Sequence, residues 1–197
     1  MSDKETIAVY DDEVDKYAKV VSTDTPHKML QLFASKLGKS DKVLDLGCGP
    51  ANFSAWMRDQ GLDVDPVDAS SEMVRHANDT YDINARVGMF DDLDATDHYD
   101  GVWASFSLLH AAKQDFPRHL HQIHTALKPN GIFYIGMKLG EQAKRDELGR
   151  LYSYYQEDEL KKYLEKTGFS ITDSSTDEGV GLSGKVSAFI EIICVKT

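Results

Sequence analysis

A short apolar run that ends in two closely spaced glycines constrains the fold of this chain more than any other feature. The run occupies residues 43–46, Gly47 and Gly49 follow it, and a helical pattern begins at residue 51. This order of strand, turn and helix is typical of open α/β sheets, in which ligands bind beyond the carboxyl ends of the strands. Because glycine lacks Cβ and readily adopts positive φ, a ligand can approach the backbone of such a turn closely.

Beyond this turn, short apolar segments alternate with helical patterns. The expected strands are residues 43–46, 62–69, 83–89, 101–106, 132–135, 169–172 and 186–195. The expected helices are residues 51–60, 71–78, 116–127 and 157–166. The alternation predicts parallel strands joined by crossover helices, and hence a doubly wound, mostly parallel seven-stranded α/β sheet. The last two strands, with an expected hairpin loop over 174–184, predict an antiparallel C-terminal edge.

Two helical patterns precede the first strand, over residues 8–21 and 26–37, and Thr25 is the expected N-cap of the second. The chain shows no internal repeat, low-complexity tract or domain boundary. We therefore expect one domain over residues 1–197, in which residues 1–38 form a helical cap over the ligand cleft.

The charge balance excludes whole classes of partner. Asp and Glu total 33 against 22 Lys and Arg, a formal net charge of −11. Nucleic-acid binding needs a basic face, so we expect no nucleic-acid partner, and anionic membrane surfaces are disfavoured for the same reason. No apolar run approaches the roughly 18 residues of a membrane span, and no signal peptide is visible. With two isolated cysteines, Cys48 and Cys194, we expect reduced thiols and a cytoplasmic location.

The glycine turn lacks the features that bind phosphate. The third glycine of the dinucleotide fingerprint would fall at Asn52, and no Lys-Ser or Lys-Thr pair follows the turn. The carboxylate of Asp45 would repel a phosphate but suits a cationic group. Asp68 follows Gly49 by about 20 residues, the spacing at which an acidic side chain hydrogen-bonds ribose in nucleotide-binding folds. These residues predict an adenosine ligand with a charged tail that carries no phosphate.

These features resemble the class I S-adenosylmethionine-dependent methyltransferases, in a subgroup that acts on small molecules. The resemblance covers roughly residues 35–140 in order. It rests on four segments, Val43–Ala51, Val67–Ser70, Met89–Leu93 and Tyr99–Ala104. It implies a Rossmann-like methyltransferase fold and S-adenosyl-L-methionine as cofactor, with S-adenosyl-L-homocysteine as product. Ala51 stands where the family has the third glycine of its turn.

The resemblance also implies which residues hold the cofactor. The methionine part would lie on the turn formed by Asp45, Gly47 and Gly49. The ribose would lie on Asp68, with Ala69 beside it.

The remaining cofactor contacts come from later strands and from the N-terminus. Met89 stands where the family often has an aspartate near the adenine, so the backbone and Phe90 are expected to make that contact. Ala104 and Ser105 match positions that line the cofactor pocket. Tyr17 lies on an N-terminal helix of the kind that covers the cofactor in related enzymes, and it is expected to reach the cofactor carboxylate.

Residues for the methyl acceptor are less sharply indicated. His110 is the first candidate for a general base, because its unperturbed pKa of about 6.5 suits proton removal; a core or capping role is the alternative. Arg145 and Arg150 are candidates to bind a substrate carboxylate or to pair with neighbouring acids on one helix. Tyr152 is a candidate for an aromatic acceptor site or for the core. The histidines within 116–127 lack the spacing of a helical zinc site, so we expect no metal.

The predicted chemistry is direct methyl transfer to a nucleophilic atom of a small-molecule acceptor. Such a reaction needs donor and acceptor held in line about 3–3.5 Å apart. Residues 104–107 read Ala-Ser-Phe-Ser and not Asn-Pro-Pro-Tyr or Asp-Pro-Pro-Tyr, which disfavours an amino group of a base or of glutamine as target. A non-catalytic S-adenosylmethionine-binding sensor or partner subunit is the alternative, and the sequence is compatible with a monomer or a homodimer.

Overall fold

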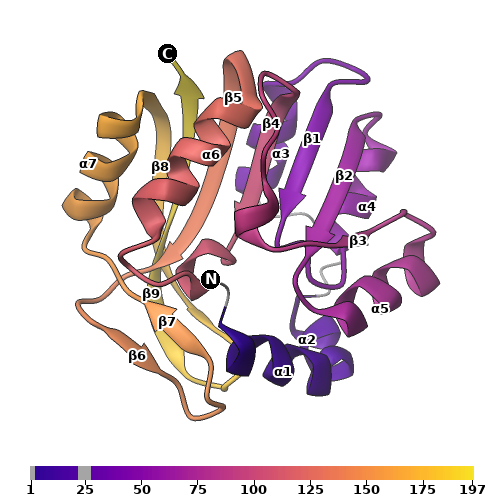
Figure 1. The fold of residues 1–197 in the computed structure, drawn as a ribbon, viewed down its shortest axis with the longest axis vertical. Helices are drawn as coiled ribbons and strands as arrows, with labels where there is room; N and C mark the ends of the chain where they lie inside the picture. Colours follow the sequence, from indigo (N-terminus) through magenta and orange to yellow (C-terminus); the bar gives the residue numbers. More distant parts are fainter. Residues whose placement is uncertain (1–2, 22–27) are drawn as a thin grey trace.

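The computed structural model describes residues 3–21 and 28–197, which form a seven-stranded sheet flanked by helices (Figure 1). The strand order is β3-β2-β1-β4-β5-β9-β8. The strands are β1 (Lys42–Leu46), β2 (Asp63–Asp68), β3 (Arg86–Val87), β4 (Tyr99–Ser105), β5 (Leu127–Lys138), β8 (Phe169–Val180) and β9 (Val186–Lys196). The first five are parallel, β9 is antiparallel to β5, and β8 is antiparallel to β9. The predicted doubly wound sheet with an antiparallel C-terminal edge is confirmed.

The helices cover the two faces of the sheet and one end of its strands. They are α1 (Lys4–Asp12), α2 (Val14–Val21), α3 (Lys28–Ser35), α4 (Asn52–Asp59), α5 (Ser71–Tyr81), α6 (Phe116–Ala126) and α7 (Glu157–Thr167), with short 3₁₀ turns η1 (Phe90–Asp92) and η2 (Leu108–His110). Helices α6 and α7 lie in front of the sheet and α3 behind it (Figure 1). Helices α1 and α2 lie beyond the carboxyl ends of β1 and β2, where sheets of this kind bind their ligands.

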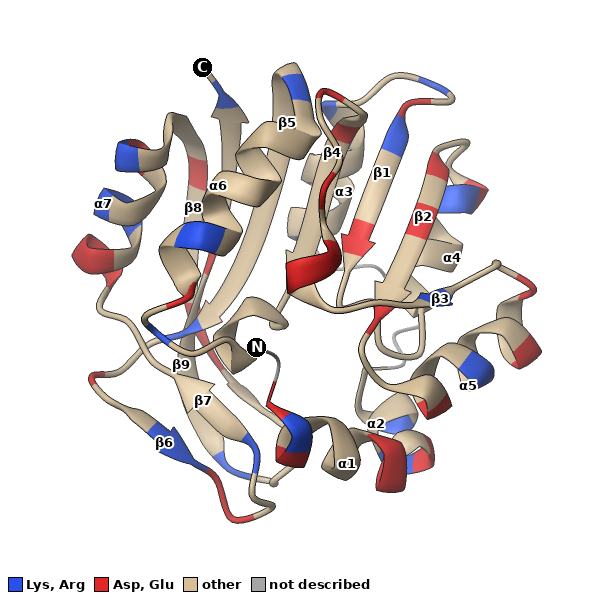
Figure 2. Ribbon diagram, in the orientation of Figure 1, with Lys and Arg blue, Asp and Glu red and all other residues tan. Residues whose placement is uncertain are grey.

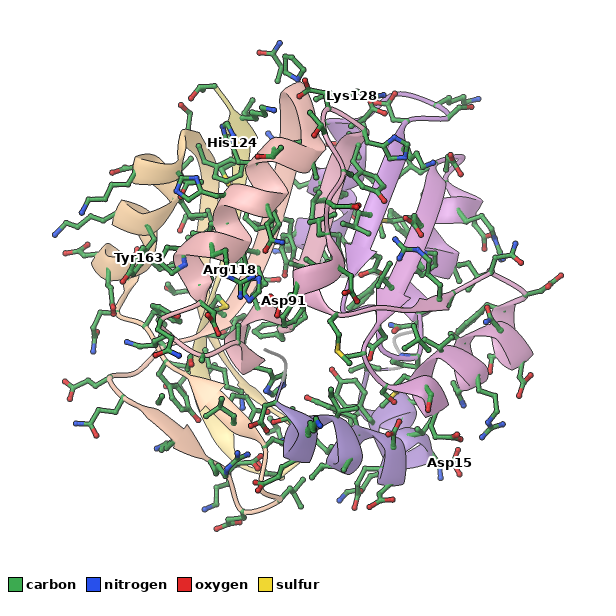
Figure 3. All side chains as sticks on the ribbon, viewed as in Figure 1. Asp15, Asp91, Arg118, His124, Lys128 and Tyr163 are labelled. Atoms are coloured by element: carbon green, nitrogen blue, oxygen red, sulfur yellow. The ribbon has the colours of Figure 1, made fainter. Side chains whose placement is uncertain are left out.

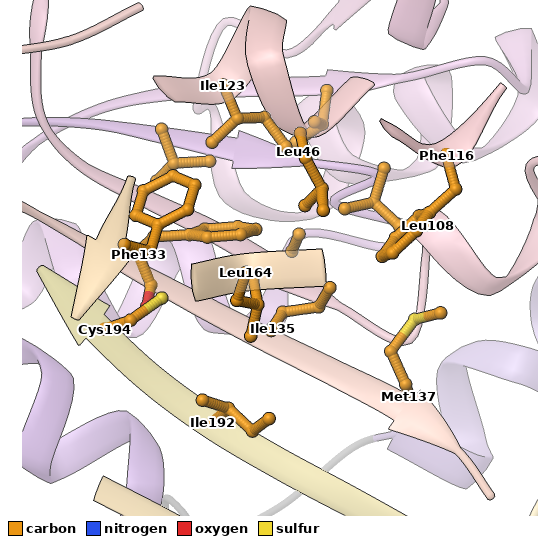
Figure 4. Close-up of a cluster of buried hydrophobic side chains, with 14 of the residues drawn as sticks. Leu46, Leu108, Phe116, Ile123, Phe133, Ile135, Met137, Leu164, Ile192 and Cys194 are labelled. Carbon is orange, nitrogen blue, oxygen red and sulfur yellow. The ribbon is translucent and has the colours of Figure 1, made fainter. Parts of the chain in front are cut away.

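The larger hydrophobic core lies between the sheet and helices α6 and α7 (Figure 4). Side chains alternate along β5, so Phe133, Ile135 and Met137 belong to this core and Tyr134 to the core on the other face. There Tyr134 stacks on Trp103 with ring centroids 3.5 Å apart. Burial on both faces fixes the register of β5 in the sheet.

The segment predicted as a cap, residues 1–38, has two different roles. Leu30 and Phe33 of α3 are fully buried, and the Phe33 ring lies 5.2 Å from that of Trp103. Helix α3 is therefore part of the core, and within the described residues α1 and α2 form the cover over the strand ends. The expected N-cap Thr25 lies outside the described residues.

The predicted helix over residues 8–21 is two helices in the structure. Glu13 separates α1 from α2, with φ −110° and ψ 19°. Since the break contains neither Gly nor Pro, apolar spacing alone predicts a continuous helix. Helix α1 also starts earlier than predicted, because the Asp3 carboxylate accepts a 2.9 Å hydrogen bond from the Thr6 N–H and caps it.

Two hairpins in the C-terminal third differ from the prediction. The expected loop over 174–184 is mostly strand, because β8 continues to Val180 and pairs there with Val186 of β9. Polar residues suit this strand because it forms an edge of the sheet and meets water. After β5, the chain forms a second hairpin of β6 (Ala143–Arg145) and β7 (Leu151–Ser153), in place of a helix.

Truncation of a core side chain should lower the free energy of unfolding much more than truncation of a side chain at the hairpin tip. Leu120 of α6 is fully buried, so Leu120→Ala should lower the free energy of unfolding by about 2–5 kcal/mol. Val186 is 63% exposed, so Val186→Ala should change it by no more than about 0.5 kcal/mol. Urea unfolding of both variants measures the difference, and equal losses would contradict the assigned core.

Candidate functional site

The glycine turn between β1 and α4 folds tightly around the end of β2. The N–H groups of Gly47 and Cys48 both donate to the carbonyl oxygen of Val67, at 2.8 and 3.0 Å. Gly47 has a φ of +81° and Gly49 one of +53°, in the left-handed region that favours glycine. A Cβ on Gly47 would lie 2.3 Å from the Cβ of Ser107. The turn therefore needs glycine at position 47 for both conformation and space.

Ala51, at the family's third glycine position, keeps a glycine-like backbone. Its φ is +60° and its ψ 24°, and it is fully buried at the start of α4. A non-glycine residue in this conformation costs roughly 1–2 kcal/mol. Alanine in place of glycine therefore adds little volume at this position, but it strains the backbone.

Asp68, the last residue of β2, joins the turn to the start of α5. Its carboxylate accepts hydrogen bonds from the Gly49 N–H at 2.8 Å and from the Ser70 N–H at 2.9 Å. Burial raises the pKa of this carboxyl, while the backbone N–H groups favour the charged form and oppose the rise. The Ser70 hydroxyl caps α5 by accepting a 3.0 Å hydrogen bond from the Met73 N–H. The orientation of the Asp68 carboxylate is thus fixed by the turn on one side and the helix on the other.

Asp45 lies beneath the same turn and is 1% exposed. Burial raises its pKa to about 7; the hydrogen bond that the Ser54 hydroxyl donates to it opposes the rise, and the charge of Asp68 adds to it. Near neutral pH the carboxyl is thus poised between its protonated and ionised forms. A cationic group bound nearby would favour the ionised form.

Two cavities meet at the turn. The inner cavity lies between α1 and the ends of β1, β2 and β4. It is lined by Asp3, Thr6, Ile7, Tyr10, Tyr17, Leu46, Gly47, Gly49, Asp68, Ala69, Ser70, Met73, Gly88, Phe90, Ser105, Phe106, Ser107 and His110.

The outer groove extends from the turn toward the β8–β9 hairpin. Among its lining residues are Val20, Lys28, Met29, Leu32, Asp45, Phe53, Lys138, Arg150, Tyr152, Asp177, Leu182, Phe189 and Glu191. It shares six residues with the inner cavity, namely Tyr10, Tyr17, Gly47, Gly49, Ser105 and Phe106. A ligand in one cavity can therefore meet a ligand in the other at the glycine turn.

The structure brings most of the predicted cofactor residues to the inner cavity. They are Tyr17, Gly47, Gly49, Asp68, Ala69, Phe90 and Ser105. Asp45 lines only the outer groove, and Ala104 is fully buried in the core. Met89 lies outside both linings and donates its N–H to the Asp92 carboxylate at 2.8 Å.

Sequence reasoning missed several lining residues. Met73 lies three positions after the Ser70 cap, so its place in the first turn of α5 was a signal that it faces the strand ends. Ser107 carries no such signal, because its contact with Gly47 joins segments that are far apart in the chain. Tyr10, on α1, also lines the inner cavity.

His110 is held as a neutral imidazole at the inner cavity. Its Nδ1 lies 2.6 Å from the Leu151 carbonyl oxygen and must donate to it, so Nε2 accepts the 2.9 Å hydrogen bond from the Tyr10 hydroxyl. The Arg150 Nη1 donates to the same hydroxyl at 3.0 Å. Burial lowers the pKa of His110 to about 4, although the hydrogen bond to Leu151 opposes this.

The two candidate arginines differ in position. Arg150 is 1% exposed and lines the outer groove, where its Nη2 and Nε donate to Asp146 at 2.6 and 3.0 Å. Arg145 lines neither cavity; it is exposed on β6 and pairs with Asp3 and Glu5 of the N-terminal segment. Figure 2 shows Lys and Arg along β6 and acidic residues on α1. The alternative of pairing with neighbouring acids thus holds for Arg150, which pairs with Asp146, but the segment is a β-hairpin and not a helix.

The loop that carries Phe90 is attached to α6. The Phe90 ring lies 5.5 Å from the ring of His119. The next residue, Asp91, forms an ion pair with Arg118, and Figure 3 shows the two side by side. This hydrogen-bonded pair lowers the pKa of Asp91. Asp91 thus anchors the aromatic wall of the inner cavity from outside.

Two further properties concern the described residues alone. Among residues 3–21 and 28–197, no helix is long and apolar enough to cross a membrane. Within the same ranges, no group of three or more His, Cys, Asp or Glu side chains is arranged to hold a metal ion.

The chain belongs to the methyltransferase domain family, whose family model matches residues 17–174. A curated relative, an uncharacterized methyltransferase of Staphylococcus carnosus, is 23% identical over 137 residues, which is 70% of this chain. The matched part spans 61% of that relative's length.

Solved structures of the same fold cover almost the whole chain. A S-adenosylmethionine-dependent methyltransferase of Methanosarcina mazei aligns with a TM-score of 0.74 at 19% identity, over 87% of this chain and 98% of its own. The 1,6-didemethyltoxoflavin-N1-methyltransferase of Burkholderia thailandensis, with bound 1,6-didemethyltoxoflavin and S-adenosylhomocysteine, aligns with a TM-score of 0.69 at 23% identity. That alignment covers 96% of this chain and 88% of the Burkholderia chain.

The close approach of Gly47 to Ser107 can be measured by a mutant cycle. Gly47→Ala should lower the free energy of unfolding by about 2–4 kcal/mol, because left-handed strain adds to overpacking. In a Ser107→Gly background the overpacking disappears, and the same change should cost only about 1–2 kcal/mol. Urea unfolding of the four proteins gives both values. The same cost in both backgrounds would show that the contact is absent.

The buried His110 should make stability depend on pH in a defined window. Its folded pKa of about 4 lies below the unfolded value of about 6.5. The unfolded state therefore binds a proton first, so the contribution of His110 is complete above pH 6.5 and is lost as the pH falls toward 4. Between pH 7 and 4, the free energy of unfolding of the wild type should fall by up to about 3 kcal/mol more than that of His110→Gln. Denaturation curves across this range test it, and parallel pH profiles would contradict it.

Proposed function

We propose that this protein transfers a methyl group from S-adenosyl-L-methionine to a nucleophilic atom of a small-molecule acceptor. The observation that carries the proposal is that one glycine turn, with Asp68 beside it, forms the boundary of two cavities. A methyl donor in the inner cavity and an acceptor in the outer groove would meet there. Family membership supports the same reaction class.

The residues of the inner cavity fit this cofactor. Gly47 and Gly49 line the cavity and carry no side chain, so the methionine part can approach the backbone of the turn. Asp68 has a fixed carboxylate on the cavity wall, suited to ribose hydroxyls. Met73 and Phe90 provide apolar surface for the adenine.

When bound, the cofactor supplies a methyl group on a positively charged sulfur, which an acceptor nucleophile can attack directly. The protein has to bind both molecules, orient them toward each other and exclude water. Helix α1 contributes Thr6, Ile7 and Tyr10 to the roof of the inner cavity. Asp68, together with Asp45 in its ionised form, places negative charge near the turn, which favours a cationic ligand there.

We assign His110 to positioning in preference to proton removal. Its lowered pKa makes it a weak base, and its Nε2 already accepts the hydrogen bond from Tyr10. It holds the Tyr10 ring at the junction of the two cavities, 5.2 Å from the ring of Tyr17. Tyr17 in turn lies against Gly49, where it is the residue we propose for the cofactor carboxylate.

A small molecule suits the outer groove because aromatic side chains line it. Phe106 and Phe189 form an edge-to-face pair 5.4 Å apart, and Tyr152 lies 4% exposed within the lining. In the Burkholderia relative of the same fold, the bound ligand beside S-adenosylhomocysteine is the small molecule 1,6-didemethyltoxoflavin. The buried free thiols of Cys48 and Cys194 suit the reducing cytoplasm, which we propose as its location.

The proposal is tested in two stages. Calorimetry should show that S-adenosylhomocysteine binds and that NAD does not; a preference for NAD would overturn the assignment of the cavity. Labelled methyl transfer from S-adenosylmethionine into a small-molecule extract should then give a labelled product. Cofactor binding without product in any extract would favour a non-catalytic sensor or partner subunit.

Loss of the Asp68 carboxylate should weaken cofactor binding selectively. Asp68→Ala should raise the free energy of S-adenosylhomocysteine binding by about 1–3 kcal/mol, because hydrogen bonds to the ligand are lost. Asp63→Ala is the control, since Asp63 lies exposed at the far end of the same strand. Calorimetry compares both with the wild type. An unchanged dissociation constant for Asp68→Ala would exclude the ribose role.

A further inference from the structure

A lysine, Lys138, lines the outer groove. Lys138 ends β5, pairs in register with Phe189 of β9, and lies on the groove side of the sheet. Its Nζ lies 4.5 Å from the centroid of the Tyr152 ring. On the side of the β8–β9 hairpin, a Cβ built on Gly181 would lie 3.4 Å from the same Nζ. The ammonium group is therefore enclosed by a strand, a hairpin and an aromatic ring.

This ammonium group has no counterion within the described part of the chain. No carboxylate of residues 3–21 or 28–197 lies within the 4.0 Å of an ion pair with Lys138. Burial and the neighbouring charge of Arg150 both lower the pKa of Lys138, and the charge of Asp146, which forms no ion pair with it, opposes them. Arg150, by contrast, is paired with Asp146. Of the two cations, Lys138 is the one that a ligand can neutralise.

An anion beside Lys138 would remove this unfavourable arrangement. A partly buried cation is stabilised by a charged hydrogen-bond acceptor far more than by an aromatic face alone. The groove also contains the carboxylates of Asp177 and Glu191, and Glu191 accepts a 2.6 Å hydrogen bond from the Tyr134 hydroxyl. Their charge disfavours a dianionic phosphate, so a monoanionic carboxylate fits best.

The walls next to Lys138 indicate what carries the carboxylate. Phe189 lies opposite Lys138 in the β-ladder, and its ring contacts Phe106 edge to face. Phe106 lines both cavities and so connects the lysine end of the groove to the glycine turn. A flat apolar body between these rings would have its acidic end at Lys138 and its other end toward the turn.

We propose that the acceptor is an aromatic or similarly flat carboxylic acid, and that Lys138 determines this specificity by binding its carboxylate. The proposal rests on the proposed function, because it assigns the outer groove to the acceptor. The Tyr152 ring contacts both cations, Lys138 with Nζ at 4.5 Å and Arg150 with Cζ at 5.2 Å from its centroid, while Arg145 has no part in the site.

The test measures binding of matched acids and amides to the protein saturated with S-adenosylhomocysteine. The probes are 4-hydroxybenzoate, 4-hydroxyphenylacetate and indole-3-acetate, each compared with its own primary amide by ligand-observed NMR titration. At least one acid should bind roughly 10-fold tighter than its amide. Lys138→Met should remove this preference, and Lys138→Arg should retain a part of it.

Lys144→Met is the matched control. Lys144 also lies over a tyrosine ring, 5.1 Å from the centroid of Tyr154, but it is exposed and outside both cavities. This variant should keep the full preference for the acid. Lys138→Met should also keep its affinity for S-adenosylhomocysteine, which shows that the variant is folded.

Three results would overturn the proposal: equal binding of every acid and its amide, no binding of any acid, or a preference that survives in Lys138→Met. The failure of the proposed function is distinguishable from these. If the wild type does not bind S-adenosylhomocysteine, the assignment of the inner cavity fails. If it binds S-adenosylhomocysteine without any preference for the acids, only the assignment of Lys138 fails.

Discussion

The hydrogen bonds that the Asp68 carboxylate accepts from Gly49 and Ser70 hold the ligand side of this protein together. They join the end of β2 to the glycine turn of β1 and to the first turn of α5. Because both donors are backbone N–H groups, the carboxylate fixes main-chain positions as well as its own direction. The tight packing of Gly47 against Ser107 extends the same arrangement to the end of β4. The inner cavity owes its shape to these contacts between three strand ends.

The two cavities divide the proposed reaction between different parts of the chain. The inner cavity is built from the parallel half of the sheet, which lies within the residues 17–174 that the family model matches, and from α1, which precedes them. The outer groove takes much of its lining from α2, α3 and the β8–β9 hairpin. A parallel sheet can therefore keep one cofactor site while the hairpin and the N-terminal helices vary the acceptor.

The parts of the fold that follow from local chemistry were predictable from sequence. Gly47 and Gly49 mark the turn, and Ser70 marks the start of α5. The alternation of apolar segments with helical patterns predicts parallel strands joined by crossover helices. What the sequence did not indicate depends on distant contacts. The polar stretch of β8 becomes strand only because β9 pairs with it, and Arg150 is buried because Asp146 and Tyr10 satisfy it. In the site, Asp68 was recognisable from spacing, whereas Ser107 was not.

The connection between α1 and the β6–β7 hairpin has a consequence for synthesis of the chain. Thr6 accepts a hydrogen bond from Leu151, Arg145 pairs with Asp3, and Arg150 binds Tyr10, so each link spans 140 residues or more. On the ribosome, the first helix emerges long before the hairpin that fastens it. The nascent protein can assemble its first four parallel strands without these links, but its roof cannot be secured until about three quarters of the polypeptide has been made. The ligand-binding form is thus completed late in translation, with the earliest residues docking among the last.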